Sequence, residues 1–190
     1  MNTLDILKNR RSYRDLDDKI KVSDEKISQV LEEVTELVPD AFNMKSQRII
    51  LVQGDLHKKL WDIIYDAFDG MVKKEKTDGF KKASGTILFY YDKALVERMK
   101  EKFPLYKDQF EPWAHQSNGM LQISMWNALD ELGLGVNLQH YNPVIDEKLR
   151  DMFGLSEDYV LLAQMVYGNI LSKPDEKEKE DIGKRFRIER

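Results

Sequence analysis

Three arginines and a serine lie within five residues near the start of the chain, in the segment Arg10–Arg14. An arginine guanidinium presents a planar fork of N–H donors that matches a phosphate or a carboxylate, and a serine hydroxyl adds one donor of adjustable direction. In an extended segment alternate side chains share a face, so Arg10, Ser12 and Arg14 would point one way and Arg11 the other. The segment predicts an anion-binding site. A solvated basic turn is the alternative, and these five residues alone favour neither.

A second basic cluster lies near the other end of the chain, over residues 184–188, and contains Arg185 and Arg187. Two further stretches have the residue types for binding a flat polar ring, namely the polar and aromatic run 139–141 and a loop that carries Asn43. Phosphate would suit the two basic clusters, and the ring could lie against the loop amides. These four stretches are the candidate binding elements of the chain.

Several common catalytic and cofactor-binding signatures are absent from the sequence. The three histidines, at positions 57, 115 and 140, have no second ligand at a metal-binding spacing, so no metal site is expected. Neither a glycine-rich phosphate loop of the P-loop or dinucleotide type nor a nucleophilic serine motif is present. The chain has no cysteine, which excludes disulfides, thiolate metal sites and cysteine nucleophiles and fits a reducing compartment.

The overall charge argues against two classes of partner. The 190 residues include 30 lysines and arginines against 34 aspartates and glutamates, which gives a formal net charge of -4. Proteins that bind nucleic acid or anionic membranes take most of their affinity from a cationic surface, so neither partner is expected. The first residues are polar, unlike a signal peptide, and no apolar run is long enough to span a bilayer. We therefore expect a soluble, cytoplasmic protein.

Hydrophobic periodicity and turn residues predict the elements that must position these candidate residues. Ser23 is expected to cap a helix that ends before Pro39, and Asp55 to cap a second helix whose apolar stripe includes Leu56 and Leu60. Further helices are expected over 92–102, 113–132 and 146–153, and strands over 48–53, 86–91 and 159–167, with a short strand running into a loop over 135–143.

Residues 70–85 differ in character, because they contain five lysines and are bounded by Gly70 and Gly85. They indicate a mobile excursion, either a lid or a solvated linker, and the linker is the commoner case.

The helix over 113–132 carries apolar residues on more than one face, so it is expected in the centre of the domain or in a subunit interface. Irregularly interleaved helices and strands indicate a single α+β domain over 1–190, with an extended, charged C-terminal tail over about 172–190.

The order of several short motifs resembles the nitroreductase family, in particular its short bacterial and fungal subgroup with a Leu-Gln-His-Tyr-Asn-Pro loop. The resemblance spans nearly the whole chain and rests on motifs that are individually weak but occur in the family's order. These motifs are Arg10-Arg11-Ser12-x-Arg14, Pro39-x-Ala41-Phe42-Asn43, Phe103-Pro104-Leu105-Tyr106, Glu111-Pro112-Trp113, Gly133-Leu134-Gly135-Val136-Asn137-Leu138-Gln139-His140-Tyr141-Asn142-Pro143, Glu176-Lys177-Glu178 and Arg185-Phe186.

The resemblance implies a nitroreductase-like fold, with a central, mostly antiparallel sheet flanked by helices, in an intertwined homodimer. One FMN would be bound non-covalently in each active site at the dimer interface. By position in the motifs, the residues implied to bind it are Arg10, Arg11, Ser12, Arg14, Asn43, Lys45, Gln139, His140, Tyr141, Arg185 and Arg187.

The implied roles differ among these residues. The first cluster would meet the phosphate, the ribityl chain and the ring edge, and the late basic pair would bind the phosphate in the same subunit or across the dimer. The run 139–141 would face the reactive edge of the ring through its main chain, so no catalytic side chain is implied. The subgroup has Asn-Ser-Gln where this chain has Asn43-Met44-Lys45. Three contacts are therefore open for the Lys45 side chain: the flavin, the nicotinamide or only solvent.

The implied activity is hydride transfer from NADH or NADPH through the flavin to a small-molecule acceptor such as a nitroaromatic compound or a quinone. The cofactor would carry the chemistry, and the protein would supply position and electrostatics. Neither the donor preference nor the physiological acceptor follows from the sequence. A non-catalytic flavin-binding protein of the same fold, with a regulatory or stress-response role, is the alternative.

Overall fold

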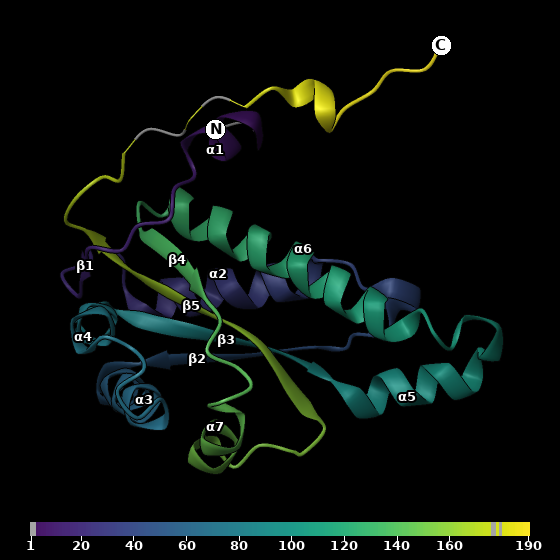
Figure 1. Cartoon of the computed structure of the whole chain (residues 1–190), viewed down its shortest axis with the longest axis horizontal. Helices are drawn as coiled ribbons and strands as arrows, with labels where there is room; N and C mark the ends of the chain where they lie inside the picture. Colours follow the sequence, from purple (N-terminus) through teal and green to yellow (C-terminus); the bar gives the residue numbers. More distant parts are fainter. Residues whose placement is uncertain (1–2, 176–177, 179) are drawn as a thin grey trace.

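In the computed structural model, which describes residues 3–175, 178 and 180–190, strand β5 (Tyr159–Ile170) is the central strand of a five-stranded sheet (Figure 1). Strand β3 (Gly85–Asp92) pairs along one side of β5, and β2 (Gln47–Gln53) pairs with the outer side of β3. Strand β4 (Gly135–Gln139) and the two-residue β1 (Leu16–Asp17) also pair with β5. All these pairs are antiparallel, which confirms the predicted sheet.

The described residues also form seven α-helices around the sheet. Their bounds are α1 (Thr3–Asn9), α2 (Asp24–Leu37), α3 (Gly54–Ala67), α4 (Lys74–Lys81), α5 (Lys93–Lys102), α6 (Phe110–Glu131) and α7 (Asp146–Phe153). Short 3₁₀ turns cover Ala41–Asn43, Pro104–Tyr106 and Ile182–Lys184. Helices on a sheet of this kind make an α+β domain, as predicted.

The sheet separates two hydrophobic layers. Every residue of β3 is buried, and its side chains alternate between the two faces because successive residues of a strand point in opposite directions. Leu88 and Tyr90 pack with α3, α4 and α7, whereas Ile87 and Phe89 pack with α2 and α6. Burial on both faces explains why the strand is a continuous apolar run in the sequence.

Local signals set several element ends as predicted. The Ser23 hydroxyl accepts a hydrogen bond from the Lys26 N–H at 3.2 Å and caps α2. The Asp92 carboxylate accepts one from the Leu95 N–H at 3.2 Å and caps α5. Helix α7 ends at Gly154, whose φ of 60° is the left-handed conformation that glycine adopts without strain. These caps confirm the predicted starts and the predicted stop.

Two elements extend beyond their predicted ends. Helix α6 begins at Phe110, upstream of the predicted 113, and includes Pro112 in its first turn, where a missing N–H costs no hydrogen bond. Strand β5 continues past 167 because Asn169 and Ile170 pair with β1. Both extensions depend on the surrounding structure, since a proline or a short edge strand gives a weak local signal.

The prediction for the start of the second helix is wrong in two respects. Helix α3 begins at Gly54 after Gln53, and no side chain caps it, so Asp55 lies in the first turn and is not the cap. Leu56 was expected in the apolar stripe but is 54% exposed, while Leu60, one turn further, is fully buried. The Leu56 side chain in the first turn of α3 therefore lies outside the hydrophobic layer in which Leu60 is buried.

The segment 70–85 is not an irregular linker. Residues 74–81 form α4, which packs against α3, and its Thr77 and Phe80 side chains are buried. The Lys76 ammonium lies 5.3 Å from the centre of the Tyr141 ring. The charged residues thus cover the outer face of an amphipathic helix. The linker interpretation is wrong for this stretch, and a lid role stays a prediction.

Helix α6 is central in the domain, as one of its two predicted placements required. Its Leu121, Met125 and Leu129 are fully buried against the sheet, and its first turn packs with α5 in a separate hydrophobic cluster. Met120 and Ile123 remain exposed on its outer face. The subunit-interface placement stays a prediction.

The C-terminal tail leaves β5 and runs past α1, away from the sheet (Figure 1). Its described residues from 180 onward are all exposed, including the apolar Phe186 and Ile188. Glu176 and Lys177, which belong to one of the motifs above, lie outside the described residues. The described tail residues from 180 onward add nothing to the core of their own chain.

A histidine is buried where α3, α4 and β3 meet. One ring nitrogen of His57, Nε2, lies 3.0 Å from the Phe80 carbonyl oxygen, and Nδ1 lies 3.0 Å from the Thr86 hydroxyl. The Trp61 indole N–H donates to the same hydroxyl at 3.0 Å. A carbonyl can only accept, so Nε2 carries the proton and Nδ1 accepts from Thr86. Burial lowers the pKa of His57 from 6.5 to about 4.

This histidine predicts a pH-dependent stability. Between pH 6.5 and 4 the unfolded chain binds a proton at His57 that the folded protein does not bind. The free energy of unfolding should therefore fall as pH is lowered through this window, by about 1.4 kcal/mol per unit in the middle of the window and about 3 kcal/mol in total. Urea unfolding of the wild type and of His57→Gln at several pH values isolates this contribution. Equal pH slopes in the two proteins would show that His57 is not held neutral.

Candidate functional site

The predicted anion-binding segment is fastened to the edge of the sheet. After α1 the chain runs beside β4, where Ser12 forms a parallel bridge with Val136. The Tyr13 N–H donates to the Val136 carbonyl at 2.9 Å, and the Asn137 side-chain amide donates to the Tyr13 carbonyl at 2.6 Å. Both backbone groups of Tyr13 are thus bound by one strand. Residues far apart in the sequence meet here.

Close packing supports this attachment. The Tyr13 side chain is buried in the layer beneath α3, α4 and α7. A Cβ atom at Gly135 would lie 2.6 Å from Leu16 and 2.7 Å from Ile170, closer than side chains tolerate, and in tight contact with Tyr13 at 3.1 Å. Glycine at the start of β4 therefore allows the segment that follows Tyr13 to lie directly against the strand.

The segment lines a polar cavity of about 500 Å³. Its lining residues are Arg10, Arg11, Ser12, Arg14, Asp15, Ser172, Pro174 and Asp175. The Arg10 guanidinium stacks on the Trp126 ring with 4.7 Å between its carbon and the ring centre, and Arg11 donates to the Asp175 carbonyl.

All four predicted residues of the segment therefore meet in one cavity. The prediction that Arg11 points away from Arg10, Ser12 and Arg14 is wrong, because the backbone is in a β bridge only at Ser12 and the strict alternation of a strand does not apply. The cavity can bind an anion, because its three guanidiniums outnumber the carboxylates of Asp15 and Asp175 that also line this partly enclosed space.

The polar and aromatic run 139–141 begins at Gln139, the last residue of β4. The Tyr141 N–H donates to the buried Gln164 side chain at 2.8 Å, and the Tyr141 ring packs edge-on against Trp61 and Phe68. Gln139 donates to the Asn137 side chain at 3.0 Å, whereas His140 is exposed. Gln139 also pairs with Gln164 between β4 and β5, so the main chain of this loop is fixed on both sides of His140.

The loop and the anion cavity occupy the two ends of one strand. His140 lies four positions after Val136, which pairs with the arginine segment, a span of roughly 13 Å along an extended strand. A molecule with a phosphate at one end and a flat ring at the other has a length of this order. The arrangement can therefore bind both ends of a mononucleotide.

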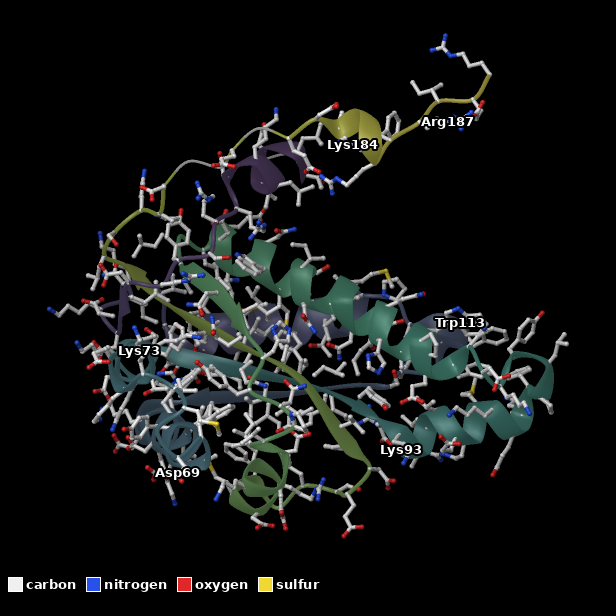
Figure 2. The ribbon with its side chains drawn as sticks, in the orientation of Figure 1. Asp69, Lys73, Lys93, Trp113, Lys184 and Arg187 are labelled. Atoms are coloured by element: carbon white, nitrogen blue, oxygen red, sulfur yellow. The ribbon has the colours of Figure 1, made fainter. Side chains whose placement is uncertain are left out.

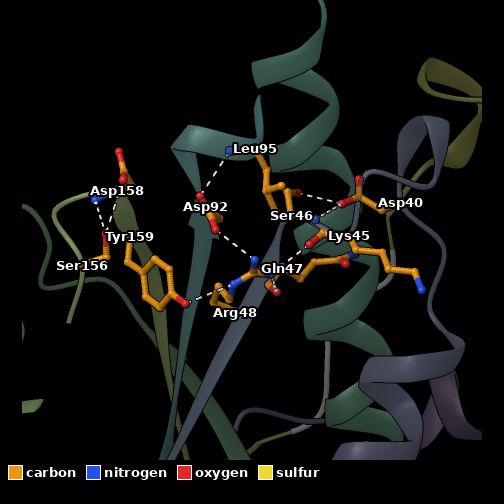
Figure 3. Close-up of polar contacts among 10 residues, drawn as sticks. All are labelled: Asp40, Lys45, Ser46, Gln47, Arg48, Asp92, Leu95, Ser156, Asp158 and Tyr159. Carbon is orange, nitrogen blue, oxygen red and sulfur yellow. Dashed lines mark hydrogen bonds and ion pairs between the residues drawn. The ribbon is translucent and has the colours of Figure 1, made fainter. Parts of the chain in front are cut away.

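The loop that carries Asn43 and Lys45 lines a different cavity. That cavity, of about 770 Å³, lies between α2 and β2, and no lining residue is common to it and the arginine cavity. Figure 3 shows the Lys45 side chain directed away from the polar contacts of its own main chain. One chain therefore does not bring Asn43 and Lys45 together with Arg10–Arg14.

This loop has an unusual backbone. Phe42, Asn43 and Lys45 have φ values of 52°, 51° and 53°. The left-handed region costs a residue with a Cβ atom about 1–2 kcal/mol. The Phe42 ring stacks on Trp113 with 5.6 Å between the ring centres, and packing of this kind offsets part of that cost. Strained loops of this kind cluster at functional sites.

The two C-terminal arginines reach neither cavity in their own chain. Arg185 pairs with Glu180 at 2.6 Å, and Arg187 pairs with Glu189. Figure 2 shows Lys184 and Arg187 on the projecting end of the tail. The residues predicted for one site are thus divided among three places: the arginine segment with the 139–141 loop, the 43–45 loop, and the tail.

Burial sets the ionisation of two groups near the arginine segment and the loop. Burial raises the pKa of Tyr141 to about 12, so its hydroxyl is neutral at physiological pH and cannot act as a general base there. Burial also raises the pKa of the Asp130 carboxyl on α6, while the nearby Arg10 guanidinium opposes the rise. The site therefore presents positive charge and fixed amide dipoles.

Three residues that shape the site were not among the binding residues predicted from the sequence: Trp126, Asn137 and Gln164. Asn137 and Gln164 are polar residues inside apolar strands, a pattern that could have marked them because a buried amide needs partners. Trp126 had no such signal, since its contact with Arg10 depends on how α1 packs against α6.

Two features are absent from the part of the chain that the structure describes, namely a metal-binding cluster and a membrane-spanning helix. No group of three or more histidine, cysteine or acidic side chains lies close enough to hold a metal ion there. None of the helices in those same residues has the length and apolar character needed to cross a membrane.

Comparison with known proteins agrees with this geometry. A model described as "Nitroreductase family" matches residues 7–169. The chain is 38% identical to the nitroreductase CinD of Lactococcus lactis, solved in complex with nicotinic acid, over 100% of both chains, with a TM-score of 0.93. CinD has also been solved with chloramphenicol, at 38% identity over 100% of both chains and a TM-score of 0.94.

Two further proteins are more distant. Nitroreductase FRM2 of Saccharomyces cerevisiae is 29% identical, over 93% of this chain and 92% of its own length. A protein of Exiguobacterium sibiricum, solved in complex with FMN, has a TM-score of 0.77 over 100% of this chain and 98% of its own. At 16% identity it shares the fold alone.

The left-handed backbone at Lys45 gives a testable prediction. Lys45→Gly and Lys45→Ala both remove the side chain, but only glycine tolerates a φ of 53° without a Cβ clash. The glycine variant should therefore be more stable, by about 1 kcal/mol after the entropy that glycine adds to the unfolded state is subtracted. Urea unfolding of the two variants measures the difference. An alanine variant as stable as the glycine variant would show that the loop is not strained at this position.

Proposed function

Because this chain belongs to the nitroreductase family, we propose that it is an FMN-dependent oxidoreductase that takes hydride from NADH or NADPH and reduces a small-molecule acceptor. The observation that carries this proposal is the placement of the arginine cavity and the 139–141 loop at the two ends of β4. That placement suits a mononucleotide whose phosphate and ring lie at opposite ends. The FMN held by the Exiguobacterium protein of the same fold supports the choice of ligand.

The residues present fit FMN. The phosphate would bind among Arg10, Arg11 and Ser12, with Arg14 beside them, where charged donors line a polar cavity. The ring would lie towards the 139–141 loop, whose main chain is held by the Gln164 side chain and by the packing of Tyr141. The buried amides hold this loop in one conformation, so its backbone dipoles need no reorganisation when charge changes nearby.

When bound, FMN supplies the redox chemistry, because it can accept a hydride and pass electrons onward. The protein's part is to bind, orient and stabilise charge. Arginine and lysine side chains and backbone N–H groups would stabilise negative charge on the ring. No side chain is needed as a general acid or base for the hydride step, and His140 would act only through its main chain.

We propose that a homodimer completes the site. One chain keeps Asn43 and Lys45, and also Arg185 and Arg187, away from the arginine cavity. A second copy can bring its own 43–45 loop and tail to that cavity. The exposed Met120 and Ile123 on the outer face of α6 provide apolar surface for such an interface.

The acceptor class rests on the relatives. CinD has been crystallised with chloramphenicol and with 4-nitrophenol, both of which carry an aromatic nitro group. We propose nitroaromatic compounds, quinones or similar flat acceptors for this chain, since such molecules can stack on a flavin ring. The relatives do not distinguish NADH from NADPH as the donor.

The direct test is the purified protein itself. We expect a yellow protein that binds FMN, sediments as a dimer and oxidises NADH or NADPH when a nitroaromatic compound or a quinone is added. Visible absorbance, analytical ultracentrifugation and NAD(P)H absorbance measure the three properties. A colourless protein that takes up no FMN would contradict the proposal. FMN binding without NAD(P)H oxidation would favour a non-catalytic flavin-binding protein.

The two basic clusters predict the effect of removing either one. A charge-assisted hydrogen bond contributes about 1.5–3 kcal/mol, so Arg10→Ala or Arg185→Ala should weaken FMN binding by roughly ten- to a hundred-fold. Arg98→Ala is the matched control, because Arg98 is exposed on α5 and lines neither cavity. Fluorescence titration with FMN measures the dissociation constants. If Arg185→Ala bound FMN as tightly as the wild type, Arg185 would have no part in the site.

A further inference from the structure

Arg48, the second residue of β2, uses its whole side chain to hold the loop that precedes it (Figure 3). Its guanidinium donates from Nη1 to the carbonyls of Lys45 at 2.8 Å and Gln47 at 2.9 Å. It donates from Nη2 to the Asp92 carboxylate at 2.9 Å and from Nε to the Tyr159 hydroxyl at 3.2 Å. Each of its three nitrogens therefore has at least one partner.

A second charged residue holds the same loop from its other end. One Asp40 carboxylate oxygen accepts the Ser46 N–H at 2.7 Å and the Ser46 hydroxyl at 2.7 Å. The other accepts the Ala41 N–H at 2.7 Å. Asp40 thus joins the first and the last residues of the loop over Ala41–Ser46.

Arg48 and Asp40 meet at a single peptide group, the one between Lys45 and Ser46. Its carbonyl accepts from the Arg48 guanidinium, and its N–H donates to the Asp40 carboxylate. Opposite charges therefore hold the two ends of one peptide dipole. This peptide directly follows the left-handed Lys45, so the two contacts favour the conformation that a lysine ordinarily avoids.

The partners of Arg48 fix this clamp to the rigid sheet. Asp92 ends β3 and caps α5, and Tyr159 begins β5. Asp92 and Tyr159 are paired in register in the two strands. The Arg48 side chain is 30% exposed and that of Asp92 is 12% exposed, so their ion pair is partly shielded from water. Three strand ends therefore set the position of one loop peptide.

We propose that Arg48 is a positioning residue for the cofactor site. Together with Asp40 it holds the Lys45–Ser46 peptide, and through that peptide it aims the Asn43 and Lys45 side chains into the cavity between α2 and β2. There they contact the ring of FMN bound to the partner copy. This inference rests on the proposed function above, because Asn43 and Lys45 act only if FMN binds.

Only arginine suits this position. Lysine carries three donors on one nitrogen, whereas Arg48 reaches acceptors on a loop, on two strands and on its own neighbour in different directions. Arg48→Lys keeps the positive charge beside Asp92 and loses the fork that reaches the Lys45 carbonyl. The Arg48→Lys variant therefore tests the contact with the Lys45 carbonyl while the positive charge stays in place.

The first measurement concerns the loop itself, in the protein without FMN. We expect Arg48→Lys to speed hydrogen exchange of the Ser46 amide at least ten-fold, because the peptide loses one of its two anchors. Tyr159→Phe is the matched control: it removes one Arg48 partner but leaves the Lys45 carbonyl contact, so exchange at Ser46 should change less than two-fold. Unchanged exchange in Arg48→Lys would overturn the inference.

The second measurement concerns FMN binding. We expect Arg48→Lys to weaken it about ten-fold, and Tyr159→Phe to leave it within two-fold of the wild type. In a protein that already carries Asn43→Ala and Lys45→Ala, the same Arg48→Lys change should alter FMN affinity less than two-fold, because nothing remains to be aimed. A full ten-fold effect in that background would indicate direct contact of Arg48 with FMN or general destabilisation, and would overturn the inference.

The outcomes also separate this inference from the proposed function. A wild-type protein that binds no FMN would overturn both, whereas tight wild-type binding with an unaffected Arg48→Lys variant would overturn the inference alone. If Arg48→Lys does not fold, Asp40→Asn weakens the same peptide clamp from its other side. It should give the same two effects, and their absence would equally overturn the inference.

Discussion

Strand β5 is the constraint on which the rest of the structure depends. It is buried along most of its length, so its backbone N–H and C=O groups must find partners on both sides. One side is filled by β3, and β4 and β1 also pair with it. This pairing brings the arginine segment to one end of β5, through β4 and β1. At the other end of the strand, Tyr159 supports the clamp that holds the 43–45 loop. The two candidate binding regions thus take their positions from one strand.

Arginine is used in two opposite ways in this protein. Arg48 has four acceptors around its guanidinium, and its charge is matched by Asp92. Such an arginine is part of the framework. The arginines of the Arg10–Arg14 segment instead line a cavity, where Arg10 stacks on Trp126 and Arg11 donates to the Asp175 carbonyl. Positive charge gathered in a partly enclosed space is unfavourable until an anion binds. Arg48 has a partner at each of its three guanidinium nitrogens and acts as a structural cation, whereas Arg10 and Arg11 border the cavity that is proposed to bind the ligand.

The division of the candidate residues between two cavities follows from the topology. The 43–45 loop precedes β2, which lies on the far side of β3 from β5, whereas the arginine segment lies beyond β4 on the opposite side of the sheet. The width of the sheet keeps them apart in one chain. The proposed dimer removes this separation without moving either loop, because each copy offers one region to the other. Rigid anchoring of both regions is then an advantage, since a ring bound between two subunits needs both surfaces in place beforehand.

The sequence by itself determined most elements and the family. Caps such as Ser23 and Asp92 act on amides three residues away, and motif order carries the resemblance, so both are readable along the chain.

The tertiary structure decided what depends on distant contacts. Residues 74–81 form a helix because Phe80 finds a buried place against α3, and Leu56 is exposed because the layer ends below it. The pairing of Tyr13 with β4, the clamp at Lys45 and the separation of Arg185 and Arg187 from both cavities have the same origin. Hydrogen bonds and burial between residues far apart in the chain leave no periodic signal in the sequence, and only the folded backbone brings them together.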